Sequence, residues 1–100
     1  MKILLTGSKG QVGFELNKKL SALGEVIATD REELNLEDAQ AIRSFVDQIK
    51  PDIIINPAAY TAVDKAESEP DLAYLINVRA PEVLAVKAAE LDIPLIHFST

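Results

Sequence analysis

The sequence contains no cysteine among its 100 residues. Disulfide bonds, thiolate nucleophiles and zinc or iron–sulfur sites with cysteine ligands are therefore excluded, and we place no metal in the site. Long hydrophobic runs are also lacking, because Ile3-Leu4-Leu5 is too short for a signal-peptide core or a membrane span. Basic residues are few: ten Lys and Arg stand against sixteen Asp and Glu, for a net charge of −6. This balance argues against nucleic acid or an anionic membrane as a partner, and we expect a cytoplasmic protein.

The chain is rich enough in hydrophobic residues to bury a core. Forty-eight per cent of the residues are hydrophobic, which excludes a disordered protein. One hundred residues suffice for one compact domain, but they are only about a third of what a two-domain nucleotide-dependent enzyme usually contains. We therefore predict a single domain over residues 1–100, without a separate substrate domain.

Short apolar runs and helical stretches alternate along the chain. The runs predict strands at 3–5, 26–29, 53–55 and 95–98, and the run at 53–55, apolar without alternation, suits a strand covered on both faces. Helices are predicted between them, and this alternation implies parallel pairing with right-handed crossovers. We predict an α/β fold, a Rossmann-like doubly wound parallel sheet in three αβα layers, of which the first four strands are present in the order 3-2-1-4.

The ends of the predicted helices follow from capping and breaking residues. The apolar stripe of the first helix comprises Val12, Leu16, Leu20 and Leu23. Gly24 is expected to stop this helix, and the second has capping residues at 35–38 and ends before Pro51. The third contains Pro81, which has no N–H. Either that helix is continuous and the Asn77 carbonyl loses its helical partner, or a new helix begins at Pro81.

A glycine-rich turn follows the first predicted strand. Gly7, Gly10 and Gly13 form a Gly-x-x-Gly-x-x-Gly pattern where the first helix opens. Gly7 permits the tight turn, Gly10 lets the backbone approach a pyrophosphate, and Gly13 lets the helix pack closely on the strand. The helix N-terminus offers N–H groups and a partial positive charge to phosphates. With an acidic residue about twenty positions on, the pattern predicts a dinucleotide site rather than a tight turn alone.

The second predicted strand ends at an acidic residue. Asp30 stands where a carboxylate accepts hydrogen bonds from the ribose hydroxyls of an adenosine. Arg31 follows directly; its guanidinium either binds the 2′-phosphate of NADP, stacks on adenine or is simply solvated. The two residues favour different cofactors, so NADH and NADPH both stay open. Asn35 and Leu36 lie beside the adenine in this interpretation, or Asn35 only caps a helix.

Small residues follow the third predicted strand. The segment Asn56-Pro57-Ala58-Ala59-Tyr60 falls at the carboxyl edge, where an open α/β sheet binds ligands. A cofactor that crosses directly above the backbone needs small side chains there, although Ala58 and Ala59 also fit ordinary turn packing. His97, the only histidine, has apolar neighbours, and we expect a hydrogen bond to hold it in the sheet rather than a role as catalytic base.

Together these segments resemble the extended short-chain dehydrogenase/reductases and, more narrowly, the dTDP-4-dehydrorhamnose reductase family. The resemblance is carried by residues 7–13, 56–67, 76–78 and 97–100. The glycine turn is shared by the whole superfamily, whereas the stretch Ala62-Val63-Asp64-Lys65 is more specific to the rhamnose-pathway reductases. The resemblance implies reduction of the nucleotide sugar dTDP-4-dehydrorhamnose to dTDP-L-rhamnose, with NADPH or NADH as cofactor.

The resemblance also assigns roles to residues. The cofactor-binding set comprises Gly7, Gly10, Gln11, Val12, Gly13, Asp30, Arg31, Asn35, Leu36, Ala58, Ala59, Tyr60 and Phe98. In this set Gly10, Gln11 and Val12 line the pyrophosphate, and Ala58, Ala59 and Tyr60 lie along the middle of the cofactor. Phe98 lies near the nicotinamide. Thr100 matches the hydroxyl that the family places beside its catalytic tyrosine, where it donates a hydrogen bond to the substrate carbonyl.

The catalytic Tyr-x-x-x-Lys pair of this superfamily is missing from the sequence. In that pair the lysine lowers the pKa of the phenol, so that the tyrosine passes a proton to the alkoxide. Tyr60 is followed four positions later by Asp64, and Tyr74 by Val78, so neither tyrosine forms it. We expect the chain to supply the cofactor-binding part of an oxidoreductase and to be inactive by itself. Its last strand would be an exposed edge, which favours self-association, for example as a homodimer.

Two other functions stay open at this point. Another sugar-nucleotide epimerase or dehydratase of the superfamily shares the glycine turn but should differ around residues 62–65. A non-catalytic NADP-binding regulatory subunit also resembles this reductase family. A Tyr-x-x-x-Lys pair after Thr100 would favour catalysis, and its loss would favour regulation.

Overall fold

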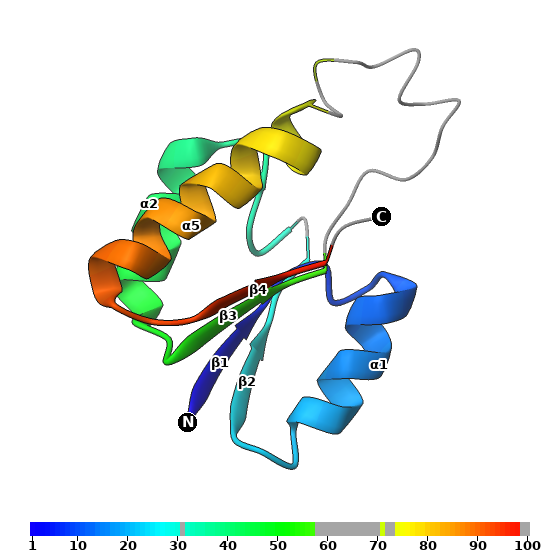
Figure 1. Ribbon diagram of the computed structural model, residues 1–100. Coiled ribbons are helices and arrows are strands. Elements are labelled where there is room, and N and C mark those ends of the chain that lie inside the picture. The colour runs from blue at the N-terminus through cyan, green and yellow to red at the C-terminus, as the bar shows by residue number, and fades with distance from the viewer. Residues whose placement is uncertain (31, 58–70, 72–73, 99–100) are drawn as a thin grey trace.

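A parallel sheet lies between two layers of helices (Figure 1). The computed structural model describes residues 1–30, 32–57, 71 and 74–98. In these residues the strands are β1 (Lys2–Leu5), β2 (Glu25–Ala28), β3 (Ile53–Asn56) and β4 (Leu95–His97). The helices are α1 (Gln11–Leu20), α2 (Ala39–Ile49), the π-helical turn η1 (Leu75–Arg79) and α5 (Ala80–Leu91). The predicted α/β class and parallel pairing are confirmed.

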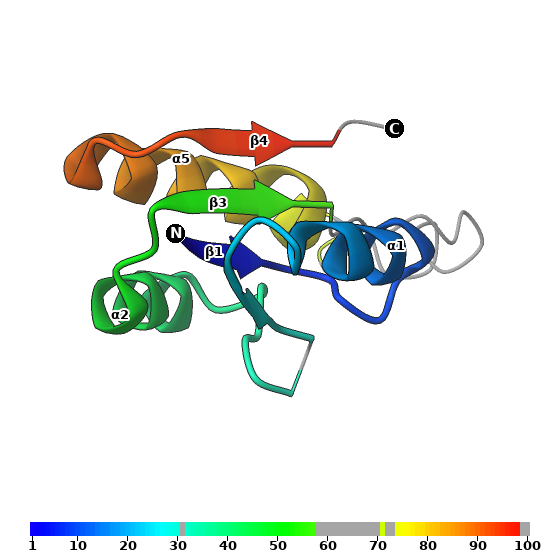
Figure 2. The ribbon, with the colours of Figure 1, turned by 90° about the horizontal axis from the view of Figure 1, so that it is seen from below.

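The order of the strands differs from the prediction. The sheet runs β2-β1-β3-β4, as Figure 2 shows, so the predicted order 3-2-1-4 is wrong. Leu4 of β1 pairs with Ile27 on one side and with Ile54 on the other. The prediction assumed that the sheet continues outward beyond β2, whereas the connection through α2 returns across β1. The reversal that creates a ligand crevice in such sheets therefore lies between β1 and β3.

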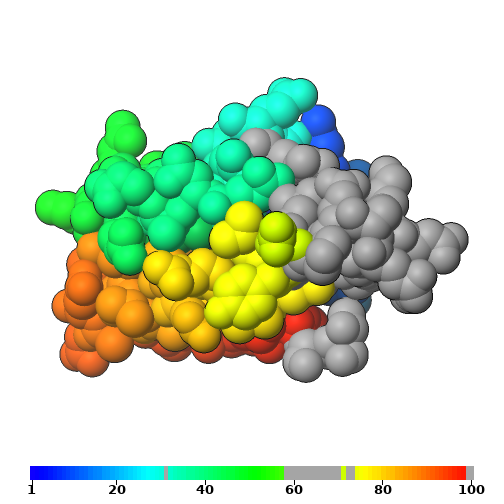
Figure 3. All heavy atoms as spheres, turned by 90° about the horizontal axis from the view of Figure 1, so that it is seen from above, coloured from blue at the N-terminus to red at the C-terminus, as the bar shows by residue number. Residues whose placement is uncertain are grey.

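The packing of α2 explains this order. The α2 stripe of Ile42 and Val46 is buried in one cluster with Leu4 and Ile54, so α2 covers β1 and β3 rather than the outer side of β2. The cluster also contains Leu84 of α5, and Figure 3 shows α2 and α5 side by side on one face. A right-handed connection that reverses direction must change faces, which places α2 opposite α1.

Successive residues of β1 pack on opposite faces of the sheet. Leu4 belongs to the core under α2 and α5, whereas Ile3 and Leu5 belong to a second core, against which Leu16 and Leu20 of α1 pack. This alternation is expected for a strand that is buried on both faces. It confirms the prediction of three αβα layers.

The first helix is shorter than predicted. It ends at Leu20 with Ser21 as its C-cap, and Val12 and Leu23 are 49% and 69% exposed, so the predicted stripe is wrong at both ends. Gly24 therefore does not stop the helix. A side-chain carbon at Gly24 would lie 2.4 Å from the Met1 carbonyl oxygen, which accepts the Glu25 N–H at 2.8 Å. Gly24 lets the chain approach the start of β1 closely as β2 begins.

The other helix ends agree better with those predicted from the sequence. Asp38 Oδ1 accepts the N–H groups of Gln40 and Ala41 at 3.0 and 3.2 Å, and α2 ends just before Pro51. At Pro81 the helix is continuous, because Arg79 and Ala80 have right-handed helical dihedrals. The Ala80 N–H donates to the Leu75 carbonyl, five residues earlier, in a π-helical turn. Within the described segments, none of the helices combines the length and apolar character that a bilayer span requires.

Candidate dinucleotide-binding site

The glycine turn lies at the carboxyl ends of β1 and β2. Gly7 has a φ of 58°, a left-handed conformation that glycine adopts without steric cost. The Gly10 N–H donates to the Gly7 carbonyl at 3.0 Å and closes the turn. The Ser8 N–H donates to the Thr29 carbonyl at 2.9 Å, which ties the turn to the end of β2. The predicted role of Gly7 in the tight turn is confirmed.

Positions 13 and 10 need glycine for different reasons. Gly13 is buried, and a side-chain carbon there would lie 2.0 Å from the Gly7 carbonyl oxygen. Its close contact is therefore with the turn rather than with the strand. Gly10 has a φ of −71°, which any residue adopts. Among the described residues, a side-chain carbon there would meet the Gly7 carbonyl oxygen at 3.3 Å, a tight contact that requires a shift of a few tenths of an ångström. The constraint from the fold is therefore much weaker at Gly10 than at Gly13, which leaves room for a further requirement from a ligand that approaches the backbone.

The N-terminus of α1 presents hydrogen-bond donors beside the turn. Gly10 is the N-cap, and no side chain in the described part of the chain caps it. The Phe14 N–H donates to the Gly10 carbonyl at 2.8 Å, so the N–H groups of Gln11, Val12 and Gly13 precede the first helical bond. These donors, together with the positive end of the helix dipole, have the chemistry that a diphosphate requires.

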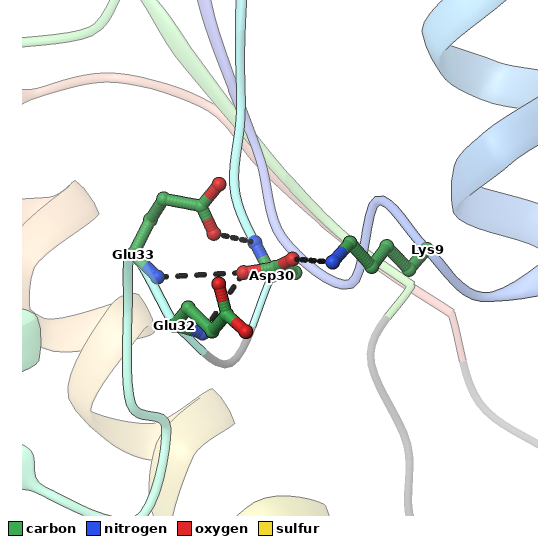
Figure 4. Close-up of polar contacts among 4 residues, drawn as sticks. All are labelled: Lys9, Asp30, Glu32 and Glu33. Atoms are coloured by element: carbon green, nitrogen blue, oxygen red, sulfur yellow. Dashed lines mark hydrogen bonds and ion pairs between the residues drawn. The ribbon is translucent and has the colours of Figure 1, made fainter.

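Asp30 accepts hydrogen bonds from two directions (Figure 4). Its Oδ2 lies 2.7 Å from the Nζ of Lys9, a residue of the glycine turn. Its Oδ1 accepts the Glu32 N–H at 2.8 Å, and the Asp30 N–H donates to Glu33 Oε2 at 3.0 Å. The predicted ribose-binding carboxylate is thereby held beside the predicted diphosphate turn, as a dinucleotide that spans both would require.

The ion pair keeps both partners charged. The hydrogen bond from Lys9, reinforced by the Glu32 N–H, holds the pKa of Asp30 below its ordinary value. The hydrogen bond to Asp30 and the nearby negative charge raise the pKa of Lys9. Lys9 was not among the predicted site residues. The available signal was a basic residue directly before Gly10, together with an acid at the end of the neighbouring strand.

A series of hydrogen-bonded polar side chains connects the carboxyl ends of three strands. The Thr6 hydroxyl donates to Asn56 Oδ1, and both residues are buried. Asn56 Nδ2 lies 3.1 Å from His97 Nδ1, which therefore accepts from the amide. The expectation that a hydrogen bond holds His97 in the sheet is confirmed. Through these contacts the three side chains hold together the ends of β1, β3 and β4.

The remaining predicted site residues are less closely associated with the turn. Leu36 packs against the core cluster under α2 and α5. Asn35 Oδ1 accepts the Glu37 N–H at 3.0 Å, while Asp38 is the N-cap of α2, so Asn35 orders the preceding turn and is not the helix cap. The Phe98 N–H donates to the Asn56 carbonyl at 3.2 Å just beyond β4. Arg31, Ala58, Ala59, Tyr60 and Thr100 lie outside the described residues.

The sheet, its reversal beside β1 and the glycine turn define an α/β domain of the Rossmann type. The chain belongs to the family whose model is described as the RmlD substrate binding domain, which matches residues 1–100. It is 46% identical over 104 residues to dTDP-4-dehydrorhamnose reductase of Escherichia coli K12, an alignment that covers 100% of this chain and 35% of that protein. The chain thus spans about a third of the length of the curated relatives it matches.

Solved structures show the same likeness. The crystal structure of a dTDP-4-dehydrorhamnose reductase from Clostridium acetobutylicum is 44% identical, with a TM-score of 0.88 over 95% of this chain and 34% of that one. The Bacillus anthracis reductase in complex with NADP is 35% identical, with a TM-score of 0.84 over 94% of this chain and 34% of that one. The family that the sequence resembles is therefore confirmed. A UDP-glucose 4-epimerase from Thermus thermophilus, 22% identical with a TM-score of 0.79, shares the fold.

Proposed function

We propose that this chain is the cofactor-binding part of an NAD(P)H-dependent dTDP-4-dehydrorhamnose reductase. The observation that carries the proposal is the geometry at Gly10, where the backbone is bare although the described part of the fold constrains this position far less tightly than Gly13. Beside it are the helix donors and the carboxylate of Asp30. The Bacillus anthracis relative, whose structure contains NADP, supports the same conclusion.

The residues of the site fit a nicotinamide dinucleotide. The N–H groups of Gln11 and Val12 would bind the diphosphate, and Asp30 would accept from the adenosine ribose. A bound NADPH or NADH supplies the hydride that reduces the keto group of the sugar. Asn56, fixed by Thr6, keeps the end of β3 in place beneath the crevice. Thr100 stays a prediction as the hydroxyl that donates to the substrate carbonyl.

Several properties of the whole protein belong to the same proposal. The substrate would be the dTDP-linked 4-keto sugar, and the residues that hold it would meet the cofactor at the carboxyl edge of the sheet. The assignment of residues 1–100 as one cofactor-binding unit, a homodimer and a cytoplasmic location stay predictions. Neither NADH nor NADPH is preferred on the observations so far.

Catalysis can be tested directly on the full-length protein. We expect it to oxidise NADPH, followed at 340 nm, only when dTDP-4-dehydrorhamnose is added, with dTDP-L-rhamnose as the product detected by mass spectrometry. A UDP-linked 4-keto sugar serves as the control for the nucleotide. Binding of NADPH without turnover of this substrate would contradict the reductase and favour a regulatory subunit.

A further inference from the structure

We infer that Glu33 is a positioning residue for the cofactor: it holds the carboxylate of Asp30 in the orientation that the adenosine ribose requires. The inference rests on the proposed function, because it assumes that a nicotinamide dinucleotide occupies the glycine turn and that Asp30 accepts from its ribose. Glu33 acts through Asp30 and not through a contact of its own with the cofactor.

Asp30 and Glu33 bond to each other in both directions (Figure 4). The Asp30 N–H donates to Glu33 Oε2 at 3.0 Å. In return, Asp30 Oδ1 accepts the N–H groups of Glu32 and Glu33, at 2.8 and 3.4 Å. An acceptor side chain and a glutamate three positions later, bonded in this reciprocal way, form the capping box that ordinarily begins a helix.

This capping box does not begin a helix. No helix starts within the described residues 32–38, and α2 begins only at Ala39, where it has an N-cap of its own, Asp38. The structure that the box does fix is Asp30 itself, at both its backbone N–H and its carboxylate. We therefore interpret the box as a support for the carboxylate at the end of β2.

The residue after Glu33 anchors the box to the core. The Leu34 side chain is 3% exposed and belongs to the cluster under α2 and α5. Its N–H donates to the Asp30 carbonyl at 3.0 Å. Because Leu34 is fixed, the exposed side chain of Glu33 extends from a backbone position that directs it back to Asp30.

The box gives the two oxygens of the Asp30 carboxylate different tasks. Oδ1 accepts backbone N–H groups, whereas Oδ2 pairs with Lys9, whose side chain is 75% exposed. Oδ2 is the oxygen that a ribose hydroxyl can reach, since an exposed ion pair rearranges at small cost. Without the Glu33 carboxylate, the Asp30 backbone would be held less firmly. Its side chain would then have to be ordered when the cofactor binds, which lowers affinity.

Calorimetric titration of the full-length protein measures this effect. The probe is whichever of NADPH and NADH the unmodified protein binds more tightly, because both carry the ribose 3′-hydroxyl. For Glu33→Ala we expect the Kd to rise about fivefold, the usual consequence of losing one hydrogen bond. Glu33→Gln should restore the Kd to within about twofold of the original value, because its side-chain oxygen still accepts the Asp30 N–H.

Two controls separate positioning from a change of charge. Glu32→Ala removes the same charge one position earlier but keeps the N–H that Asp30 accepts, so the Kd should change by less than about twofold. In an Asp30→Ala background, Glu33→Ala should also change the Kd by less than about twofold, because no carboxylate is left to position.

Steady-state turnover provides a further readout. Glu33→Ala should raise the KM for the cofactor while kcat stays within about twofold, because the adenosine ribose is remote from the keto group of the sugar. A general loss of folded enzyme would instead lower kcat and leave KM unchanged.

The outcomes distinguish the inference from the function on which it rests. An unchanged Kd in Glu33→Ala, an equal rise in Glu32→Ala, or the same rise in the Asp30→Ala background would overturn the role of Glu33 while the dinucleotide site stands. Failure of Glu33→Gln to restore affinity would also contradict it. Failure of the unmodified protein to bind either cofactor would overturn the proposed function and the inference with it.

Discussion

A side-chain carbon at Gly13 would lie 2.0 Å from the carbonyl oxygen of Gly7, which is the residue that turns the chain out of β1. The contact joins the first and the third glycine of the turn and sets how closely α1 approaches β1. The middle glycine, Gly10, makes no comparable contact. The three glycines of one pattern therefore satisfy different requirements, and substitutions should separate them.

Gly13→Ala should destabilise the protein by about 3 kcal/mol, at the upper end of ordinary overpacking costs, because the methyl group must displace backbone rather than a flexible side chain. Urea unfolding followed by circular dichroism measures the loss. Gly10→Ala is the matched control and should cost about 1 kcal/mol, since it weakens the cap and makes one tight contact of 3.3 Å with the Gly7 oxygen. Equal losses for the two variants would show that the close contact at Gly13 is not a constraint on the fold.

Thr6→Val should destabilise the protein by about 1–3 kcal/mol, because it removes the hydroxyl that donates to the buried Asn56 Oδ1 and leaves that oxygen unsatisfied. Thr29→Val provides a close comparison. Thr29 is equally buried and its hydroxyl donates to the Leu5 carbonyl, but that carbonyl also accepts the Thr29 N–H at 2.8 Å. The free energy of unfolding, measured with urea, should therefore fall clearly less for the Thr29 variant than for the Thr6 variant. A larger loss of stability for Thr29→Val than for Thr6→Val would contradict the importance of the hydrogen bond from Thr6 to Asn56.

The Lys9–Asp30 pair should make stability depend on pH. The pKa of Asp30 is lowered in the folded protein, so its contribution is present above the ordinary aspartate value, about 3.9, and is lost as the pH falls through the lowered pKa. The pKa of Lys9 is raised, so that contribution is lost only as the pH rises through the raised value.

Comparison with Asp30→Asn isolates this effect. The difference in melting temperature between the unmodified protein and the variant should be present from about pH 5 to about pH 9 and should shrink progressively below about pH 4, as the pH falls toward the lowered pKa of Asp30. Added salt should also reduce it, because Lys9 is exposed. A difference that stays constant down to pH 2 would show that Asp30 stabilises the fold by some other means than its charge.

Structural features that depend on a few neighbouring residues could be predicted from the sequence. The left-handed turn at Gly7, the cap at Asp38 and the helix end before Pro51 follow from residues that restrict their own backbone or bond to it directly. The two-sided burial of β3 followed from an apolar run without alternation. These features depend on few neighbours, so sequence spacing was enough.

Features that depend on distant neighbours were not predicted. The strand order was wrong because the faces that α2 covers are decided by its packing with Leu4 and Ile54. Lys9 was missed because its partner, Asp30, lies in the next strand and comes close only when β1 and β2 pair. The exposure of Val12 likewise depends on where α1 begins relative to the turn.

The most direct test of the account is the affinity of NADPH for the full-length protein and for Gly10→Ala, measured by calorimetry at the same pH and salt concentration. We expect the variant to stay folded, with an unchanged circular dichroism spectrum, and its Kd for NADPH to rise about tenfold or more, since the methyl group occupies the approach of the diphosphate. An unchanged Kd in the folded variant would contradict the proposed site, because the cofactor would then not lie against the backbone of the glycine turn.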